Sequence, residues 1–212
     1  MAATSLVLDD AVELTRTGDI WLFRGATFAD MAIRAATNAP VNHVGMAVVL
    51  DDLPPLLWHA ELGRSLPDVW TGKHQRGVQL HLLRDAVTTW HDKYRQRGFL
   101  RQLDATITPE MEDAVLKVIA RLDGTPFPST LDMSRRWVFG RVRYGTSLET
   151  LYCAELVAST YQAMGLLPDN RPVNWFDPGR FWSGDRLELL NGATLSNEIE
   201  IQMPGTATAI GA

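Results

Sequence analysis

The stretch that decides the fold is HVGMAVVL at residues 43–50, followed by DDLPP at 51–55 and LLWHAEL at 56–62. The first segment is apolar on both faces of a strand, which is typical of a strand in the middle of a sheet. The two aspartates and two prolines form a strong turn signal, and the apolar residues after them predict a second strand. Together the three segments predict an antiparallel hairpin.

Shorter patterns extend this hairpin into a sheet. Residues 18–23 predict a strand after a turn, residues 77–83 and 98–103 predict further strands, and residues 186–202 predict two edge strands. We therefore expect an α+β fold in which a mostly antiparallel sheet packs against helices.

Helices are expected in three places. Residues 26–38 carry apolar side chains roughly on one face. A second helix begins with Thr108 as its cap and Pro109 at its first position, and Gly124 ends it. The third is expected over residues 153–164.

The remaining segments have weaker patterns. Residues 124–150 lack clear periodicity and predict a long loop around a site. Residues 177–179 predict a short helical turn, and the tail from residue 204 is expected to be frayed. The length suits a single domain over residues 1–212, with its core at about 18–190.

Composition excludes several classes of function. The net charge is −5 and no basic run occurs, so nucleic acid is not an expected partner. No stretch of 18 apolar residues predicts a transmembrane segment. The N-terminus lacks the pattern of a secretory signal, and one free cysteine fits a reducing compartment. We expect a cytoplasmic protein, or one exported by a route that needs no signal peptide.

Cys153 is the single cysteine of the chain, in LYCAELV at residues 151–157. It cannot form an intrachain disulfide or a site with several cysteine ligands. At the start of the predicted helix, its thiolate would be stabilised by unpaired N–H groups and the helix dipole. A lone cysteine in an apolar helix is nevertheless more often a core residue.

Hairpin geometry supplies a base and a residue to orient it. Residues that face each other across a hairpin have numbers with a constant sum, and a turn centred near residue 52 or 53 makes that sum about 104 to 106. The numbers of His43 and Glu61 sum to 104, so we expect them to face each other. His59 shares that face of its strand but is the weaker partner, because its sum with His43 is 102.

Each of these residues alone has an ordinary structural explanation. A histidine at a strand start is usually a satisfied polar residue, and Glu61 alone resembles a solvated surface charge. In combination, Cys153, His43 and Glu61 fit the pattern of a nucleophile, a base and a group that orients the base.

Four motifs resemble one family of enzymes. GDI at residues 18–20, NHVGM at 42–46, Glu61, and YCAELV at 152–157 are similar to the permuted papain-like cysteine amidases, the YaeF/YiiX-like branch of the NlpC-type superfamily. The resemblance spans about residues 18–165. His43 precedes Cys153 by 110 residues, the order that a circular permutation of papain would give.

The resemblance implies a circularly permuted papain-like fold and a Cys153–His43–Glu61 triad that cleaves an amide bond through a thioester. It implies that the backbone N–H of Cys153 helps to bind the oxyanion, and that Tyr152 donates its hydroxyl or lines the pocket. No metal or organic cofactor is needed. Ala154 departs from the family, in which serine is frequent at this position.

Two other functions remain open. The same fold occurs in acyltransferases, thioesterases and phospholipases that act on lipids, and an apolar tunnel lined by Trp58, Trp70 or Trp137 would favour that reading. A non-catalytic binding domain is the third. The expected partner is thus a peptide, a peptidoglycan fragment or an acyl lipid.

Overall fold

The sheet is the centre of the molecule. The computed structural model describes residues 5–26, 31, 34, 38–126, 148–185 and 187–204. Within these residues, seven strands form one sheet in the order β1-β9-β6-β2-β3-β4-β5. β1 pairs with β9 in parallel, and the other neighbouring pairs are antiparallel. The expected α+β class with a mainly antiparallel sheet is confirmed.

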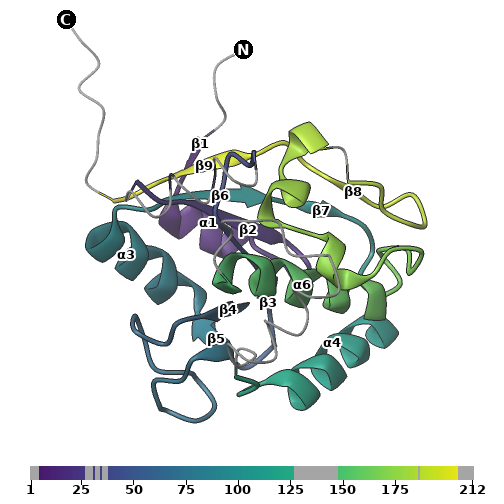
Figure 1. Cartoon of the computed structure of the whole chain (residues 1–212), viewed down its shortest axis with the longest axis horizontal. Coiled ribbons are helices and arrows are strands. Elements are labelled where there is room, and N and C mark those ends of the chain that lie inside the picture. Colours follow the sequence, from purple (N-terminus) through teal and green to yellow (C-terminus); the bar gives the residue numbers. More distant parts are fainter. Residues whose placement is uncertain are drawn as a thin grey trace, which may run out of the picture.

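The elements follow the chain in a simple order (Figure 1). The strands of the sheet are β1 (Ser5–Val7), β2 (Ile20–Arg24), β3 (His43–Val48), β4 (Leu56–Glu61), β5 (Gly77–Leu82), β6 (Arg97–Arg101) and β9 (Ile199–Gln202). β7 (Leu103–Asp104) and β8 (Thr194–Leu195) form a separate pair. The α-helices are α1 (Leu8–Leu14), α3 (Leu83–Tyr94), α4 (Pro109–Leu122) and α6 (Leu148–Ala163). Three short 3₁₀ turns follow: η1 (Val173–Trp175), η2 (Pro178–Phe181) and η3 (Ser183–Asp185).

The predicted hairpin is formed by β3 and β4. Met46 pairs with Trp58 and Val48 with Leu56, so facing residues have the expected sum of 104. The turn is closed by a hydrogen bond from Leu53 N to Leu50 O. All six residues of each strand are buried, as the apolar sequence of the hairpin requires.

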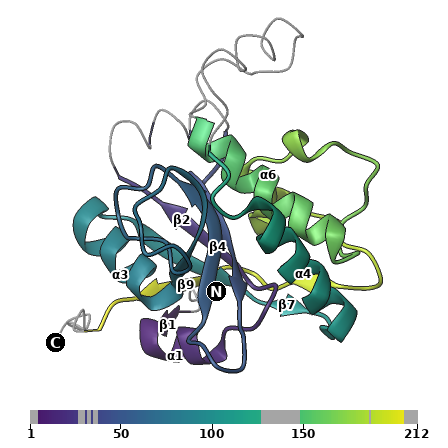
Figure 2. The same cartoon turned by 90° about the horizontal axis from the view of Figure 1, so that it is seen from below.

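Helices cover both faces of the sheet, so the molecule has three layers (Figure 2). α4 and α6 pack on one face with alternate strand residues such as Leu22, Val44 and Met46. α1 and α3 pack on the other face, where Trp21 and Phe23 belong to a second apolar cluster. Because side chains alternate along a strand, successive residues of β2 belong to the two apolar clusters in turn. None of the helices described is long and apolar enough to cross a membrane.

Helix α4 shows the start signals that its sequence predicts. The Thr108 hydroxyl accepts a hydrogen bond from Met111 N at 3.3 Å, and Pro109 is the first helical residue. Asp177 caps η2 in the same way, since its side chain accepts from Gly179 N at 2.9 Å. Both termini follow from local chemistry, because capping oxygens satisfy N–H groups that lack a partner in the helix.

Several elements differ from the sequence-based prediction. β9 is not an edge strand but lies between β1 and β6. α1 and α3 were not predicted, although the buried residues of α3 (Leu83, Ala86, Val87 and Trp90) have helical spacing. The helix expected over residues 26–38 falls largely outside the described residues, as do most of the loop expected over residues 124–150 and the tail from residue 205 onward.

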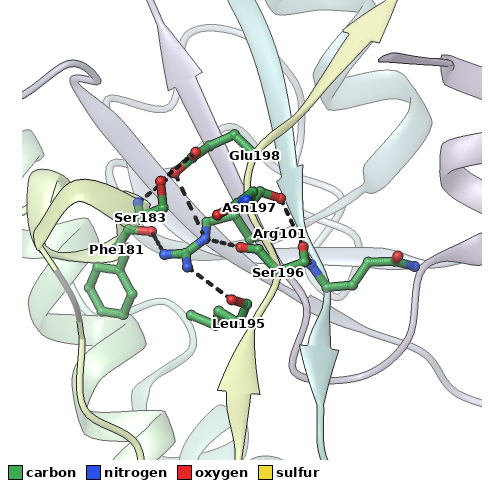
Figure 3. Close-up of polar contacts among 8 residues, drawn as sticks. Arg101, Phe181, Ser183, Leu195, Ser196, Asn197 and Glu198 are labelled. Atoms are coloured by element: carbon green, nitrogen blue, oxygen red, sulfur yellow. Dashed lines mark hydrogen bonds and ion pairs between the residues drawn. The ribbon is translucent and has the colours of Figure 1, made fainter. Parts of the chain in front are cut away.

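Arg101, on β6, fastens the C-terminal segment to the sheet (Figure 3). Its guanidinium donates to the carbonyls of Ser196 at 2.6 Å, Phe181 at 2.5 Å and Leu195 at 3.2 Å. The Glu198 carboxylate lies 3.8 Å from Nε and itself accepts from the backbone N and hydroxyl of Ser183. A buried cation is thereby held by backbone dipoles and one counter-charge.

Candidate functional site

Three buried histidines form a row across the hairpin and the next strand. His43 lies at the start of β3, His59 on β4 and His81 on β5. His43 Nε2 is 3.2 Å from His59 Nδ1, and His59 Nε2 is 3.1 Å from His81 Nδ1. The three rings are therefore linked end to end by two hydrogen bonds.

The strand pattern places all three rings on the face covered by α3. His43 pairs with Phe23 across β2 and β3, and Phe23 belongs to the apolar cluster of that face. Trp90 of α3 packs edge-on against His43 and His59, with ring centroids 5.1 and 5.0 Å apart. Trp90 therefore covers the rings of His43 and His59.

Gly45 leaves the space that the row occupies. A Cβ atom at Gly45 would lie 2.7 Å from the Leu57 side chain and 3.2 Å from the Cβ of His59. A larger residue in the family-like motif at 42–46 would therefore press on the middle histidine. We read this glycine as a packing requirement of the histidine row.

Burial keeps the row uncharged. Desolvation lowers the pKa of His43 to about 3 and that of His81 to about 4, and it lowers the pKa of His59 well below the ordinary value. Neighbouring histidines add smaller repulsions. Near His81, the Asp68 carboxylate and the Leu66 carbonyl act in the opposite direction and raise its pKa. Neutral imidazoles can accept a proton, which is the form that a base requires.

Glu61 lies at the end of β4, and its carboxylate has a hydrogen-bond partner other than His43. Its Oε1 accepts from the Ser65 hydroxyl at 2.6 Å. Burial raises the pKa of this carboxyl, and hydrogen bonds from Ser65 and the Trp90 side chain lower it in part. The ring of His43 turns to His59, which the sequence marked as the weaker partner. The triad with Glu61 stays a prediction.

Cys153 lies in the second turn of α6, and its side chain is fully buried. The helix begins at Leu148, five residues earlier than the predicted start, so Cys153 does not stand at a helix N-terminus. That correction removes the expected stabilisation of its thiolate by free N–H groups, because these belong to the first four residues of a helix. Tyr152, the residue before it, is half-buried.

Cys153 and His43 belong to opposite faces of the sheet. Cys153 packs in the cluster of α6 with Val44 and Met46, the neighbours of His43 that point the other way. α6 packs mainly on β3 and β4, the two strands that carry His43 and His59. His43 is the first residue of β3, so its backbone lies at the end of that strand.

Other expected features have separate locations. Trp58 is buried and donates to Thr160 at 3.1 Å, whereas Trp70 is 52% exposed. Trp137 lies outside the described residues. In the part of the chain that the structure describes, no three His, Cys, Asp or Glu side chains converge as metal ligands would.

Sequence reasoning missed His81 and Trp90. The signal for His81 was present, because residues 78, 80 and 82 of the predicted strand are apolar and leave residues 79 and 81 on the opposite face. Leu57 pairs with His81, and His59 pairs with Gln79. Trp90 could only be found by predicting α3.

Comparisons with known proteins give a distant likeness. No protein-family model matches the chain, and no curated protein matches it. A solved structure described as the metalloprotein yiiX from Escherichia coli O157:H7 is similar, with 20% sequence identity and a TM-score of 0.46. The match covers 69% of this chain and 64% of that one, so it spans less than two thirds of that protein. The neighbour carries the name of the branch that the motifs resemble. The likeness is too weak to establish the papain-like fold, the permutation or a reaction.

Proposed function

We propose that this chain is a cysteine hydrolase that cleaves an amide bond, with Cys153 as nucleophile and His43 as base. The hydrogen bond between His43 Nε2 and His59 Nδ1 is the observation that best supports this role. It engages one nitrogen of His43 and leaves Nδ1 to exchange a proton with the thiol. His59 then takes the orienting role that the sequence assigned to Glu61.

The reaction follows from these atoms. His43 Nδ1 takes the Sγ proton of Cys153, and the thiolate attacks the carbonyl carbon to form a tetrahedral intermediate. The imidazolium gives its proton to the leaving amine, and a thioester remains. His43 then accepts a proton from water as the water oxygen attacks the thioester carbonyl; the C–S bond breaks, the acid is released, and the imidazolium returns its proton to Cys153 Sγ. The Tyr152 hydroxyl is the proposed donor to the oxyanion. With Cys153 in the second turn of α6, its N–H is no longer our candidate.

The proposal requires the thiol and the ring to meet past the end of β3. His43 stands at that end, and α6 lies over β3 and β4, so the two side chains come from adjacent elements. A peptide or a peptidoglycan-like peptide is the proposed substrate class. Acyl transfer or hydrolysis on a lipid is the alternative that a substrate panel separates.

Labelling of the single cysteine tests the nucleophile. We expect an acyl electrophile to modify native protein at Cys153, detected by mass, and Cys153→Ala to lose both labelling and hydrolysis of peptide or muropeptide substrates. Cys153→Ser is the matched control for packing. Wild-type protein that labels in urea but stays unmodified when native, between pH 5 and 9, would show that Cys153 is a core residue.

A further inference from the structure

Arg24 is the last residue of β2, and it belongs to the same face of the sheet as Cys153. Side chains alternate along a strand, and Leu22, two residues earlier, lies in the apolar cluster that contains Cys153. The pairing of Phe23 with His43 places Arg24 one residue beyond the start of β3. Arg24 is therefore at the end of the sheet where the proposed thiol and base have to meet.

The guanidinium of Arg24 is held in a corner formed by two aromatic rings. Its central carbon lies 5.2 Å from the ring centroid of Phe99 and 5.1 Å from that of Trp182. These two rings meet edge to face, with centroids 5.2 Å apart. Nε of Arg24 also donates to the Pro40 carbonyl at 2.6 Å. The orientation of the guanidinium is thus fixed before a ligand binds, which lowers the entropic cost of binding.

The two terminal nitrogens of Arg24, Nη1 and Nη2, are left open. Among the described residues, the bond to Pro40 is the only hydrogen bond of the guanidinium, and no carboxylate forms an ion pair with it. The side chain is half-buried, and neither terminal nitrogen is enclosed by protein. A carboxylate near it, that of Glu200, accepts from Arg97 at 2.8 Å instead. An arginine with a fixed plane and an open edge is suited to binding an oxyanion.

The charges around Arg24 leave an excess of positive charge. Burial is the main cause that lowers its pKa, and the nearby Arg97 and Arg34 lower that pKa further. Glu200 and Glu198 raise it by smaller amounts. Because guanidinium has a very high ordinary pKa, Arg24 stays charged at neutral pH. A ligand with one negative charge would both fill the open edge and offset this repulsion.

We propose that Arg24 binds a carboxylate of the substrate and makes the site selective for acidic peptides. The edge that carries Nη1 and Nη2 can hold both oxygens of a carboxylate side by side. A single guanidinium suits the one charge of a carboxylate better than the nearly double charge of a phosphate group. The carboxylate site stands on Arg24 and its neighbours alone, whereas the identity of the bound peptide as a substrate rests on the proposed function.

Nitrogen-15 NMR of the Arg24 side chain tests the carboxylate site without turnover. The Nε–H signal, assigned with Arg24→Lys, is followed while the wild-type protein is titrated with a terminally blocked alanyl-glutamate dipeptide. The glutamine counterpart of that dipeptide, which differs only in the carboxylate, is the control. We expect a saturable shift with the acidic dipeptide and none with the neutral one. A signal that does not move, or one that moves only with inorganic phosphate or phosphatidylglycerol micelles, would overturn the proposal.

Two substitutions separate the charge of Arg24 from its planar edge, with affinity measured by calorimetry and folding by urea unfolding. Arg24→Gln removes the charge, and we expect affinity for the acidic dipeptide to fall about 10- to 100-fold, as when a hydrogen bond to a charged group is lost. Arg24→Lys keeps the charge without the planar edge and should lose less. Arg121→Gln, at an exposed position of α4, is the matched control that should change nothing. Wild-type affinity in the folded Arg24 variants would overturn the proposal.

Turnover separates the carboxylate site from the proposed function. For peptide pairs that differ in one carboxylate, we expect Arg24→Gln to raise the KM of the acidic peptide about 10- to 100-fold at nearly unchanged kcat, because Arg24 binds the ground state and the transition state alike. The KM of the neutral peptide should not change. Hydrolysis with equal KM values for both peptides in the wild-type protein would overturn the selectivity and leave the hydrolase function intact. Binding of the acidic dipeptide through Arg24 without hydrolysis of any peptide would support the carboxylate site and reject the hydrolase function.

Discussion

Arg101 and the histidine row are two buried polar networks on one sheet, and they are built in opposite ways. Arg101 is a cation whose donors meet three carbonyls and the Glu198 carboxylate. His43, His59 and His81 are neutral and bond one another. The donors of Arg101 are already engaged by these acceptors, whereas a proton taken up at one end of the row can be passed along it as one N–H bond breaks and the next forms. The first arrangement is suited to holding a segment in place and the second to chemistry.

Their energetic costs differ for the same reason. Burial lowers the pKa of Arg101, and the nearby Glu198 carboxylate raises it again. In the row, burial acts on imidazoles that can lose a proton, so they are neutral and need no counter-ion. A substitution in the Arg101 network should therefore lower the free energy of unfolding, whereas a substitution in the histidine row should lower activity.

The largest expected effect is on activity. His43→Gln removes the proposed base, and we expect turnover to fall about 10²- to 10⁴-fold, the usual contribution of general acid–base catalysis. In denaturant unfolding, the free energy of unfolding should change by a much smaller proportion than turnover does. The exposed His91→Gln is the matched control. Full turnover in His43→Gln would assign the base to another group.

The next effect is on stability. Arg101→Met should lower the free energy of unfolding by about 3–5 kcal/mol, because it leaves the half-buried Glu198 carboxylate without its counter-charge and three carbonyls without donors. Urea unfolding gives the value. Adding Glu198→Gln should recover part of the loss. If folded Arg101→Met also lost the labelling of Cys153, the Arg101 network and the site around the histidine row would be coupled.

A smaller effect follows from pH. The histidines of the row have pKa values of about 3 and 4 at its ends, below the ordinary 6.5. Between the folded pKa values and the ordinary 6.5, the unfolded chain therefore binds more protons than the folded one. The stability that the row contributes is present above about pH 6.5 and is lost as the pH falls toward 4. Glu61, with a raised pKa, works in the opposite direction from 4.5 upward. Melting temperatures from pH 7.5 to 4.5 should show the decline. Arg101→Met should keep the same slope, and His81→Phe should reduce it.

The smallest effect is expected at Glu61. Because this carboxylate accepts from Ser65, with no hydrogen bond to His43 among the described contacts, Glu61→Gln should leave turnover nearly unchanged. The amide oxygen of glutamine can still accept from Ser65. A large loss of kcat would restore Glu61 as the orienting residue and move His59 to a packing role.

The sequence was sufficient for the hairpin and insufficient for the site. The DDLPP turn and two apolar runs determine the register of β3 and β4, because a shift by one residue would exchange their faces. That register correctly brings residues 43 and 59–61 together. It does not say which side chain His43 bonds, because that depends on Trp90 and on the space at Gly45.

The start of α6 illustrates a signal that was missed. Thr146 and Glu149 have the spacing of a capping box and Ser147 directly precedes Leu148, so the sequence contains a start signal that the helix predicted over residues 153–164 overlooked. Which face of the sheet receives α6 is decided by tertiary packing. β9 was predicted as a strand, but its place between β1 and β6 depends on a partner almost two hundred residues earlier in the chain.

That last pairing sets an order of events during synthesis. β1 is among the first described residues to leave the ribosome, yet the strand it pairs with, β9, is completed only when Gln202 has been made. The local β3–β4 hairpin can close long before, since short loops close fastest. The sheet should thus grow outward from the histidine-bearing hairpin, with the β1–β9 edge added last and most slowly.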